Sequence, residues 1–260
     1  MRRLLGLVRA CHPEACAAVT AVAVLLGVAV GRSAGGLALV GTAVLAGQLC
    51  IGWLNDVVDA DRDTAAGRGD KPVAAGDVGR RPVAAAAGVA GLACVPLSLA
   101  VGIVPGVLHL VAVGSALAYD LGLKATVVSV VPYLVSFGLL PVFVVLGHAP
   151  VAWWLPAAGA LLGAGAHFAN VLPDLAVDEA TGIRGLPHRI GAAAGRGVTV
   201  AALLAASAVL AVGPSGQPVA RLVLTGVGVV VLVAGRRWLF RAVLVVALLD
   251  VVQLVIATWS

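Results

Sequence analysis

The stretch that decides the fold of this chain is residues 36–63, which read GLALVGTAVLAGQLCIGWLNDVVDADRD. Its first twenty residues are almost all apolar, and about twenty such residues are what an α-helix needs to cross a bilayer. The stretch then ends in an acidic cluster formed by Asn55, Asp56, Asp59, Asp61 and Asp63. Carboxylates are costly beside hydrocarbon, so a membrane helix that ends this way needs something for its acids to hold.

The composition of the whole chain agrees with a membrane location. Of its 260 residues, 61% are hydrophobic and only 11% are charged, and the mean hydropathy is +1.09. A soluble domain carries roughly twice that charged fraction. We therefore expect an all-α polytopic membrane protein, built as a single domain over residues 1–260.

Apolar runs of spanning length recur along the chain, separated by breaks that are rich in glycine and proline. They predict about nine transmembrane helices. The predicted spans are 15–31, 36–55, 82–102, 105–121, 127–146, 152–172, 195–213, 218–235 and 239–257.

The basic residues indicate how the bundle is oriented. With the N-terminus in the cytosol, all 17 Lys and Arg residues except Arg32 and Arg221 fall in cytosolic segments. Cytosolic loops of membrane proteins carry such an excess, so we expect a cytosolic N-terminus and an outer C-terminus. The same placement explains the net charge of +5 without a nucleic-acid-binding face. The acids, apart from Asp250, also lie on the cytosolic side, so the predicted active site faces the cytosol.

A second acidic pair, Asp174 and Asp178, follows the sixth predicted span. At about 100° per residue, Asp56, Asp59 and Asp63 fall within about 60° of one another on a helix, and the second pair is spaced i, i+4. Asp61 and Arg62 would point elsewhere. One such cluster is typical of a solvated helix end with basic partners, but two on one membrane face favour a cation site. Oxygen ligands suit Mg²⁺, and Mg²⁺ suits a diphosphate.

These motifs resemble those of the UbiA superfamily of intramembrane prenyltransferases. Asn55-Asp56-x-x-Asp59-x-x-x-Asp63 is similar to its first aspartate motif, and Asp174-x-x-x-Asp178 to its second. Asp70-Lys71-Pro72 resembles its basic-residue–proline step, while Tyr119 and Lys124 resemble its tyrosine–lysine pair. The stretch from Leu172 to Arg189 is similar to actinobacterial members.

The resemblance implies a bundle around a central cavity, dependence on Mg²⁺ and an isoprenoid diphosphate donor. The five motif aspartates would hold the metal. Lys71, Lys124 and Arg68 would bind phosphate oxygens as cations. The ionised prenyl group would stay in the apolar cavity of the bundle, which membrane lipid surrounds, until a hydrophobic or aromatic acceptor captures it.

Other polar residues have two open interpretations each. Asn55, Tyr119 and Arg184 are candidates for substrate binding, while Arg184 could also order its loop. Asn170 lies in a predicted span, where polar residues are functional candidates, and it could contact the acceptor or bond to another helix. The histidines His12, His109 and His148 are expected at loop ends or at the membrane interface.

Three functions compete at this point. A Mg²⁺-dependent prenyltransferase is the first, and a terpene cyclase that ionises the same donor without an acceptor is the second. Aromatic residues would stabilise a migrating cation, and their 4% share favours transfer over cyclisation. A transporter is the third, but it predicts polar residues along both halves of a path through the bilayer, and the outer half has almost no charge.

Overall fold

The computed structural model describes residues 2–213, 241 and 245, and within them every regular element is helical. The prediction of an all-α fold is therefore confirmed. In chain order, the elements are α1 (Arg2–Ala10), α2 (Pro13–Ala29), α3 (Ala34–Val58), α4 (Ala60–Ala65), α5 (Arg80–Val101), α6 (Ile103–Leu121), the short 3₁₀ helix η1 (Leu123–Ala125), α7 (Val131–Val145), α8 (Trp154–Val171), α9 (Leu175–Ala180) and α10 (Leu186–Val212).

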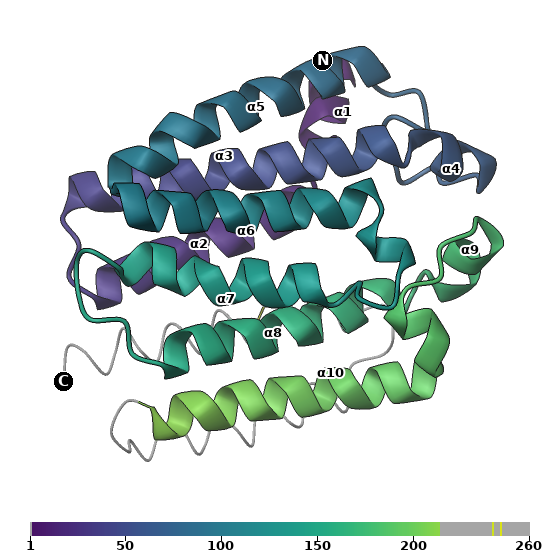
Figure 1. Cartoon of the computed structure of the whole chain (residues 1–260). Coiled ribbons are helices and arrows are strands. Elements are labelled where there is room, and N and C mark those ends of the chain that lie inside the picture. Colours follow the sequence, from purple (N-terminus) through teal and green to yellow (C-terminus); the bar gives the residue numbers. More distant parts are fainter. Residues whose placement is uncertain (1, 214–240, 242–244, 246–260) are drawn as a thin grey trace.

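The long helices lie side by side as one bundle (Figure 1), in which α3 packs on α2, α5 and α6, α7 on α6 and α8, and α8 on α10. The two short helices that follow the aspartate motifs, α4 and α9, lie at the same end of the bundle, on the right in Figure 1. The fold thus brings two sequence segments more than one hundred residues apart to one end of the molecule.

The predicted spans can be compared with these helices up to residue 213. Each of the first seven overlaps one long helix, with ends that differ by a few residues, except that α10 begins nine residues before the predicted start of 195. The spans 218–235 and 239–257 lie outside the described residues, so the count of nine stays a prediction. Helix α1 was not predicted. It joins α2 at a bend of 54°.

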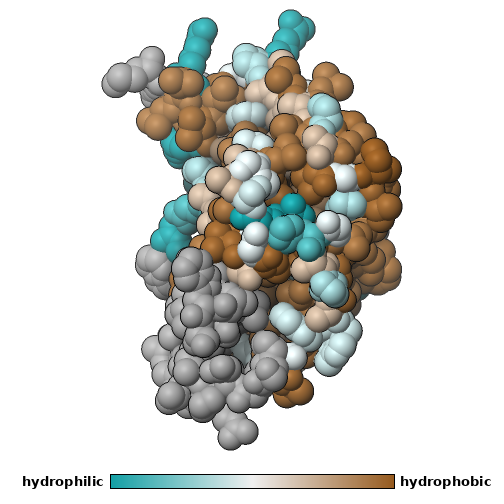
Figure 2. Space-filling model, turned by 90° about the vertical axis from the view of Figure 1, so that its left-hand side faces the viewer, coloured by the Kyte–Doolittle hydropathy of each residue, from teal (hydrophilic) through white to brown (hydrophobic). Residues whose placement is uncertain are grey.

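Length and composition allow several of the described helices to cross a membrane. Four qualify alone, namely α3, α5, α6 and residues 186–210 of α10, and the bent pair α1–α2 makes a fifth. Large apolar side chains are exposed along α5 and α6, as expected of helices that face lipid. Figure 2, which views the end of the bundle away from α4 and α9, shows a mostly hydrophobic surface with a small hydrophilic area near its middle.

Small residues set how closely the helices approach. On α8, Gly159 and Gly163 lie one turn apart, and a Cβ at either position would collide with the backbone oxygen of Phe137 or Tyr133 on α7. Close helix contacts in membranes commonly depend on such residues. This contact fixes the position of α7, and with it the rings of Tyr133 and Phe137.

Helix α1 packs across the loop of residues 66–79 that follows the first aspartate motif. Ala10 is fully buried with Val78 and Val83, and the indole Nε1 of Trp53 donates to the Leu7 carbonyl at 2.9 Å. The loop is therefore held between α1 and the end of α3, beside the acidic residues.

Candidate functional site

A chamber of about 700 Å³ opens between α2, α3, α6, α7 and α8. Charged side chains line its end near α4 and α9, while most of the deeper wall is apolar. A chamber of this kind suits an amphiphile, with a polar head at one end and a hydrocarbon tail at the other. The charged residues in the wall are Arg9, Glu14, Asp59, Arg62, Asp63, Arg68, Asp70, Lys71, Asp120, Lys124, Asp174 and Asp178.

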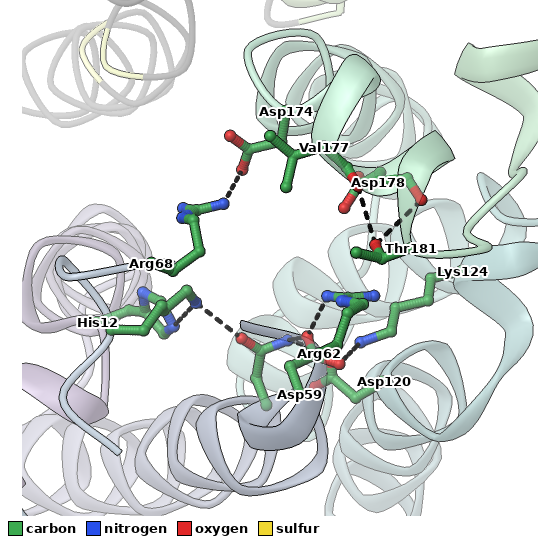
Figure 3. A network of polar contacts seen from close by, with 12 residues as sticks. His12, Asp59, Arg62, Arg68, Asp120, Lys124, Asp174, Val177, Asp178 and Thr181 are labelled. Carbon is green, nitrogen blue, oxygen red and sulfur yellow. Dashed lines mark hydrogen bonds and ion pairs between the residues drawn. The ribbon is translucent and has the colours of Figure 1, made fainter. Parts of the chain in front are cut away.

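Asp59 lies at the centre of the charged end, where α3 stops and α4 begins. Its carboxylate accepts a hydrogen bond from Lys124 Nζ and pairs with Arg62 Nη2 at 2.8 Å (Figure 3). The predicted continuous helix is thus broken at this residue, and the break turns Arg62 into the chamber. The expectation that Arg62 points away from the motif is wrong.

Asn55 joins the aspartate motif to two other segments. Its amide nitrogen donates to Asp120 Oδ1 at 2.8 Å and to Asp59 Oδ2 at 3.2 Å, and its oxygen accepts from Lys71 Nζ at 3.3 Å. Asp120, at the end of α6, is buried and lines the chamber. Sequence reasoning missed Asp120, although its place four residues before Lys124 was a usable signal.

Asp56 supports the wall from behind. It is buried, and its Oδ2 accepts the backbone N–H of Val73 at 3.1 Å, so that it holds the loop of residues 66–79 against α3. Its other oxygen, Oδ1, has no hydrogen-bond partner among the described residues. Asp56 is not part of the chamber wall, unlike Asp59 and Asp63.

For two of the motif carboxylates, nearby positive charges do not fully offset the cost of burying the charged form. Burial raises the pKa of Asp63 in α4 and of Asp178 in α9, although nearby basic residues act in the opposite direction. Asp63 Oδ2 is buried, and no residue in the described part of the chain forms a hydrogen bond with it. Both carboxylates would be stabilised in the charged form by a cation brought to the chamber.

Arg68 connects the two aspartate motifs. It makes a bidentate contact with Asp70, with both distances 2.9 Å, and its Nη1 lies 3.3 Å from Asp174 Oδ2 (Figure 3). The Arg68 guanidinium lowers the pKa of Asp70 to about 2. Its backbone N–H also donates to the Asp63 carbonyl at 2.9 Å, so Arg68 contacts the end of the first motif and the start of the second.

The second motif does not continue helix α8. The helix ends at Val171, a turn follows, and Asp174 caps the separate short helix α9. Asp178 faces the chamber with its Oδ2 3.5 Å from Nε2 of the buried His188. Arg184, predicted to bind substrate, is 68% exposed, pairs with Glu179 at 2.7 Å and is not in the chamber wall.

Aromatic residues cover the chamber next to the charged end. Tyr119 and Tyr133 meet edge to face with ring centres 5.2 Å apart, and both rings also contact the imidazole of His167. Asn170 Nδ2 lies 3.4 Å from the Tyr133 hydroxyl, and both residues line the chamber. The predicted residues Tyr119 and Asn170 are therefore brought together on one wall.

His12 was expected at a loop end or membrane interface. It does sit between α1 and α2, in a left-handed conformation with φ 57°, but it also lines the chamber. Its Nε2 is 3.2 Å from Lys71 Nζ. A neutral His12 ring can accept a hydrogen bond from the lysine through this nitrogen.

Gly185, just before α10, couples that helix to the lysine segment. A Cβ at this position would collide with the Lys124 carbonyl oxygen and with Ser129 Oγ, and the next residue, Leu186, donates its N–H to that Oγ at 2.9 Å. The start of α10 is therefore in direct contact with the backbone that carries Lys124.

The donor chemistry of the charged end fits a hard cation, because carboxylate oxygens are its preferred ligands and Asp63 Oδ2, in the chamber wall, has no hydrogen-bond partner among the described residues. In the part of the chain that the structure describes, no three acids, histidines or cysteines are already grouped at metal-ligand spacing. Lys124, Arg62 and Arg68 occupy the carboxylates instead. Binding a metal would require these ion pairs to exchange partners.

Comparison with known proteins gives the same architecture. The sequence profile of the UbiA prenyltransferase family matches residues 16–249, so the chain belongs to this family. Comparison with proteins of curated function found no significant match.

Solved structures show how general the fold is. A UbiA homologue from Archaeoglobus fulgidus, bound to DMAPP and Mg²⁺, matches with a TM-score of 0.74 at 14% identity, over 97% of this chain and 98% of that one. An apo UbiA homologue from Aeropyrum pernix K1 gives 0.77 at 16% identity, over 95% and 98%. A digeranylgeranylglyceryl phosphate synthase structure gives 0.64 at 13% identity, over 100% and 98%. The bundle is thus a shared scaffold.

Proposed function

We propose that the chain is a Mg²⁺-dependent integral membrane prenyltransferase, which moves a prenyl group from an isoprenoid diphosphate to a hydrophobic acceptor. The single observation that carries the proposal is the two-part chamber, charged where the two aspartate motifs meet and apolar beyond. Family membership supports it, as do the DMAPP and Mg²⁺ bound by the Archaeoglobus homologue.

The cations at the mouth of the chamber would bind the diphosphate. Arg68, Lys71 and Lys124 all line it, and each is already directed by an acid, an amide or a histidine. Guanidinium and ammonium groups match phosphate oxygens and stabilise the negative charge that develops on a leaving diphosphate.

The motif carboxylates would hold the metal. Asp59, Asp63, Asp174 and Asp178 line the chamber, while Asp56 would act from behind the wall. Bound Mg²⁺ would supply further positive charge next to the leaving group. Lys124, which pairs with Asp59 in the chamber wall, would be placed to contact the diphosphate.

The apolar part of the chamber would protect the prenyl cation. Tyr119, Tyr133 and Phe137 form a continuous aromatic wall, with the last two rings stacked at 6.0 Å. Aromatic faces attract a cation, and the apolar lining keeps water from capturing it.

This aromatic wall is also the observation that favours the second candidate, a terpene cyclase. The sequence has few aromatic residues, but the fold concentrates three of them beside the charged end. A cyclase would use the same diphosphate site and need no acceptor.

One assay separates the candidates. Purified protein in lipid nanodiscs is given geranyl, farnesyl or geranylgeranyl diphosphate with Mg²⁺, with and without phenolic and lipid acceptors, and diphosphate release and organic products are measured. Release that yields a prenylated acceptor supports transfer, whereas acceptor-independent release of a cyclic hydrocarbon supports cyclisation. No release from any donor would exclude both.

We also propose that the charged end faces the cytosol, with membrane lipid around the bundle. The placement of Lys and Arg supports this orientation. A cysteine introduced at Asp61, which is 86% exposed, should react with a membrane-impermeant maleimide in inside-out vesicles and stay unlabelled in right-side-out vesicles. The reverse pattern would refute the orientation.

A further inference from the structure

A buried histidine lies deep in the chamber, away from the metal and diphosphate end. His109 on α6 is only 3% exposed, yet it lines the chamber. It precedes Asp120 by eleven residues, which places it about 16 Å along the helix and on nearly the same face. The expectation that His109 is a loop-end or interface residue is wrong.

The hydrogen bonds around His109 fix which ring nitrogen carries the proton. The hydroxyl of Ser98 on α5 donates its one proton to the Cys94 carbonyl at 2.6 Å. Its oxygen must therefore accept from His109 Nδ1, which lies 2.8 Å away. A neutral His109 consequently has its proton on Nδ1 and a free lone pair on Nε2.

Packing fixes the plane of the ring. Its face stacks on Phe143, with centres 4.3 Å apart and planes 14° from parallel, and Cε1 would lie 3.6 Å from a Cβ at Gly47. Phe143 is fully buried, so the face of the ring is covered. The edge that carries Nε2 remains, together with the opposite face, to line the chamber, and no described residue forms a hydrogen bond with this nitrogen.

Two other polar residues line the same region of the chamber. Gln48 is the neighbour of Gly47 on α3, and Ser136 on α7 donates to the Ala112 carbonyl at 2.8 Å, leaving its lone pairs available. A prenyl tail is hydrocarbon and has no use for these groups. Their presence in an otherwise apolar wall indicates a ligand with a polar group at this depth.

We propose that His109 forms a hydrogen-bond-accepting subsite, which binds an O–H or N–H group of a lipophilic substrate about 16 Å from the metal end. The inference rests on the proposed function, because that function supplies the diphosphate end from which the depth is measured. The polar group belongs either to the acceptor or to an oxidised donor tail. Both present the same chemistry to Nε2.

Saturated alkyl diphosphates test the subsite, since they lack an allylic bond and cannot ionise. Binding is measured with Mg²⁺ by displacement of labelled geranyl diphosphate from nanodisc-embedded protein, for chains of about eight to about fourteen carbons that bracket the helical distance. Each length is compared with a terminal methyl and with a terminal hydroxyl. In the wild type, one length should tolerate or prefer the hydroxyl, and His109→Leu should weaken that ligand about 5- to 30-fold relative to its methyl partner.

A second arm identifies the source of the polar group. With 3-methylbutyl diphosphate held at the charged end, the binding of free 1-decanol and of its methyl ether is measured by equilibrium dialysis against empty nanodiscs. A hydroxyl preference that depends on His109 in this arm assigns the subsite to the acceptor. The same preference only on the tethered chain assigns it to the donor tail.

Matched variants separate the subsite from general packing. His109→Gln keeps an acceptor oxygen and should retain part of the preference, and Ser98→Ala frees Nδ1 and should reduce it. Val113→Ala, an apolar change in the same wall, should alter both members of each pair equally. A hydroxyl preference identical in wild type and all three polar variants would overturn the subsite. Failure of every diphosphate to bind with Mg²⁺ would instead refute the proposed function. If His109→Leu does not fold, His109→Gln and Ser98→Ala decide the question.

Discussion

The two aspartate motifs occupy the same end of the bundle but differ in how firmly they are held. Asp56, Asp59 and Asp63 are all buried. Asp56 is bonded to the loop of residues 66–79 and Asp59 to η1, while Asn55 bonds the same motif to α6. The Asp174 and Asp178 side chains are 40% and 18% exposed, the first just before and the second on α9, a six-residue helix with no buried residue. The first side is therefore already in place before a ligand binds, whereas the second has room to adjust.

This difference suggests a division of labour within the site. Preorganised charges contribute most to catalysis, because they need no reorganisation during the reaction. Residues on weakly packed segments are better suited to closing over a ligand. We therefore expect substitutions on the first side to lower kcat, and substitutions on the second side to act mainly on Mg²⁺ and substrate affinity.

The largest effect is expected for Asp59→Asn, which removes the charge at the centre of the first side. It would weaken metal binding and leave the buried Lys124 without its acid, so kcat should fall by about a thousandfold. The rate of diphosphate release at saturating Mg²⁺ measures it. Asp61→Asn is the matched control, since this neighbouring aspartate is exposed and pairs only with Arg80 among the residues the structure describes. Equal losses in both variants would contradict the central role of Asp59.

The second effect concerns Asp178→Asn. Because Asp178 sits on the more exposed side, its loss should raise the Mg²⁺ concentration for half-maximal activity about 10- to 100-fold. The thermal unfolding temperature should change less than in Asp59→Ala, which leaves a buried charge unpaired. Mg²⁺ titrations and unfolding scans of both variants provide the test. A larger decrease in unfolding temperature for Asp178→Asn than for Asp59→Ala would contradict the proposed difference between the two sides.

The third effect is a pH dependence of metal binding. Burial raises the pKa of Asp63 and Asp178, so protons compete with Mg²⁺ at higher pH than at an ordinary aspartate. Lowering the assay from about pH 7.5 to about pH 5.5 should increase the Mg²⁺ requirement. Stability without metal, measured in the presence of a chelator, should change with pH in the opposite direction. With its raised pKa values the native state binds more protons than the unfolded state, so the free energy of unfolding falls as pH rises from the ordinary to the raised pKa. An Mg²⁺ requirement that is flat over this pH range would contradict the assignment.

The smallest effects distinguish two arginines. Arg68→Ala should raise the KM for diphosphate about tenfold, because Arg68 joins Asp70 and Asp174 at the mouth of the chamber. Arg184→Ala should change it less than about twofold, since an exposed ion pair contributes little. Initial-rate kinetics over a range of donor concentrations measure both. A strong effect at Arg184 would show that its segment closes over the substrate.

The sequence predicted the helical bundle and the meeting of its motifs because both depend on long, regular patterns. Seven apolar runs became seven helices, and the two acidic motifs share one end of the bundle. Helical periodicity failed where the helix stops. The break at Asp59 turned Arg62 inward, and the folded-back loop placed the Val73 N–H on Asp56. Nothing in the spacing of the acids encodes that loop.

Residues that act across helices were the hardest to predict. Asp120 depends on Asn55 from α3, and His109 on Ser98 from α5. Each partner lies on a different helix, so only packing reveals the pair. The periodicity of α6 does place His109 and Asp120 on one face, and a search for polar residues eleven apart would have found them.

Gly185 links the two sides of the site, because it lies between the segment of the second motif and the segment that carries Lys124. Because the first residues of α10 rest on the Lys124 backbone, a shift of α9 and α10 toward a ligand would push directly on the segment that carries this lysine. A movement on the side of the second motif would thus be transmitted to the side of the first motif. Any larger residue at position 185 would push the start of α10 away from the Lys124 backbone.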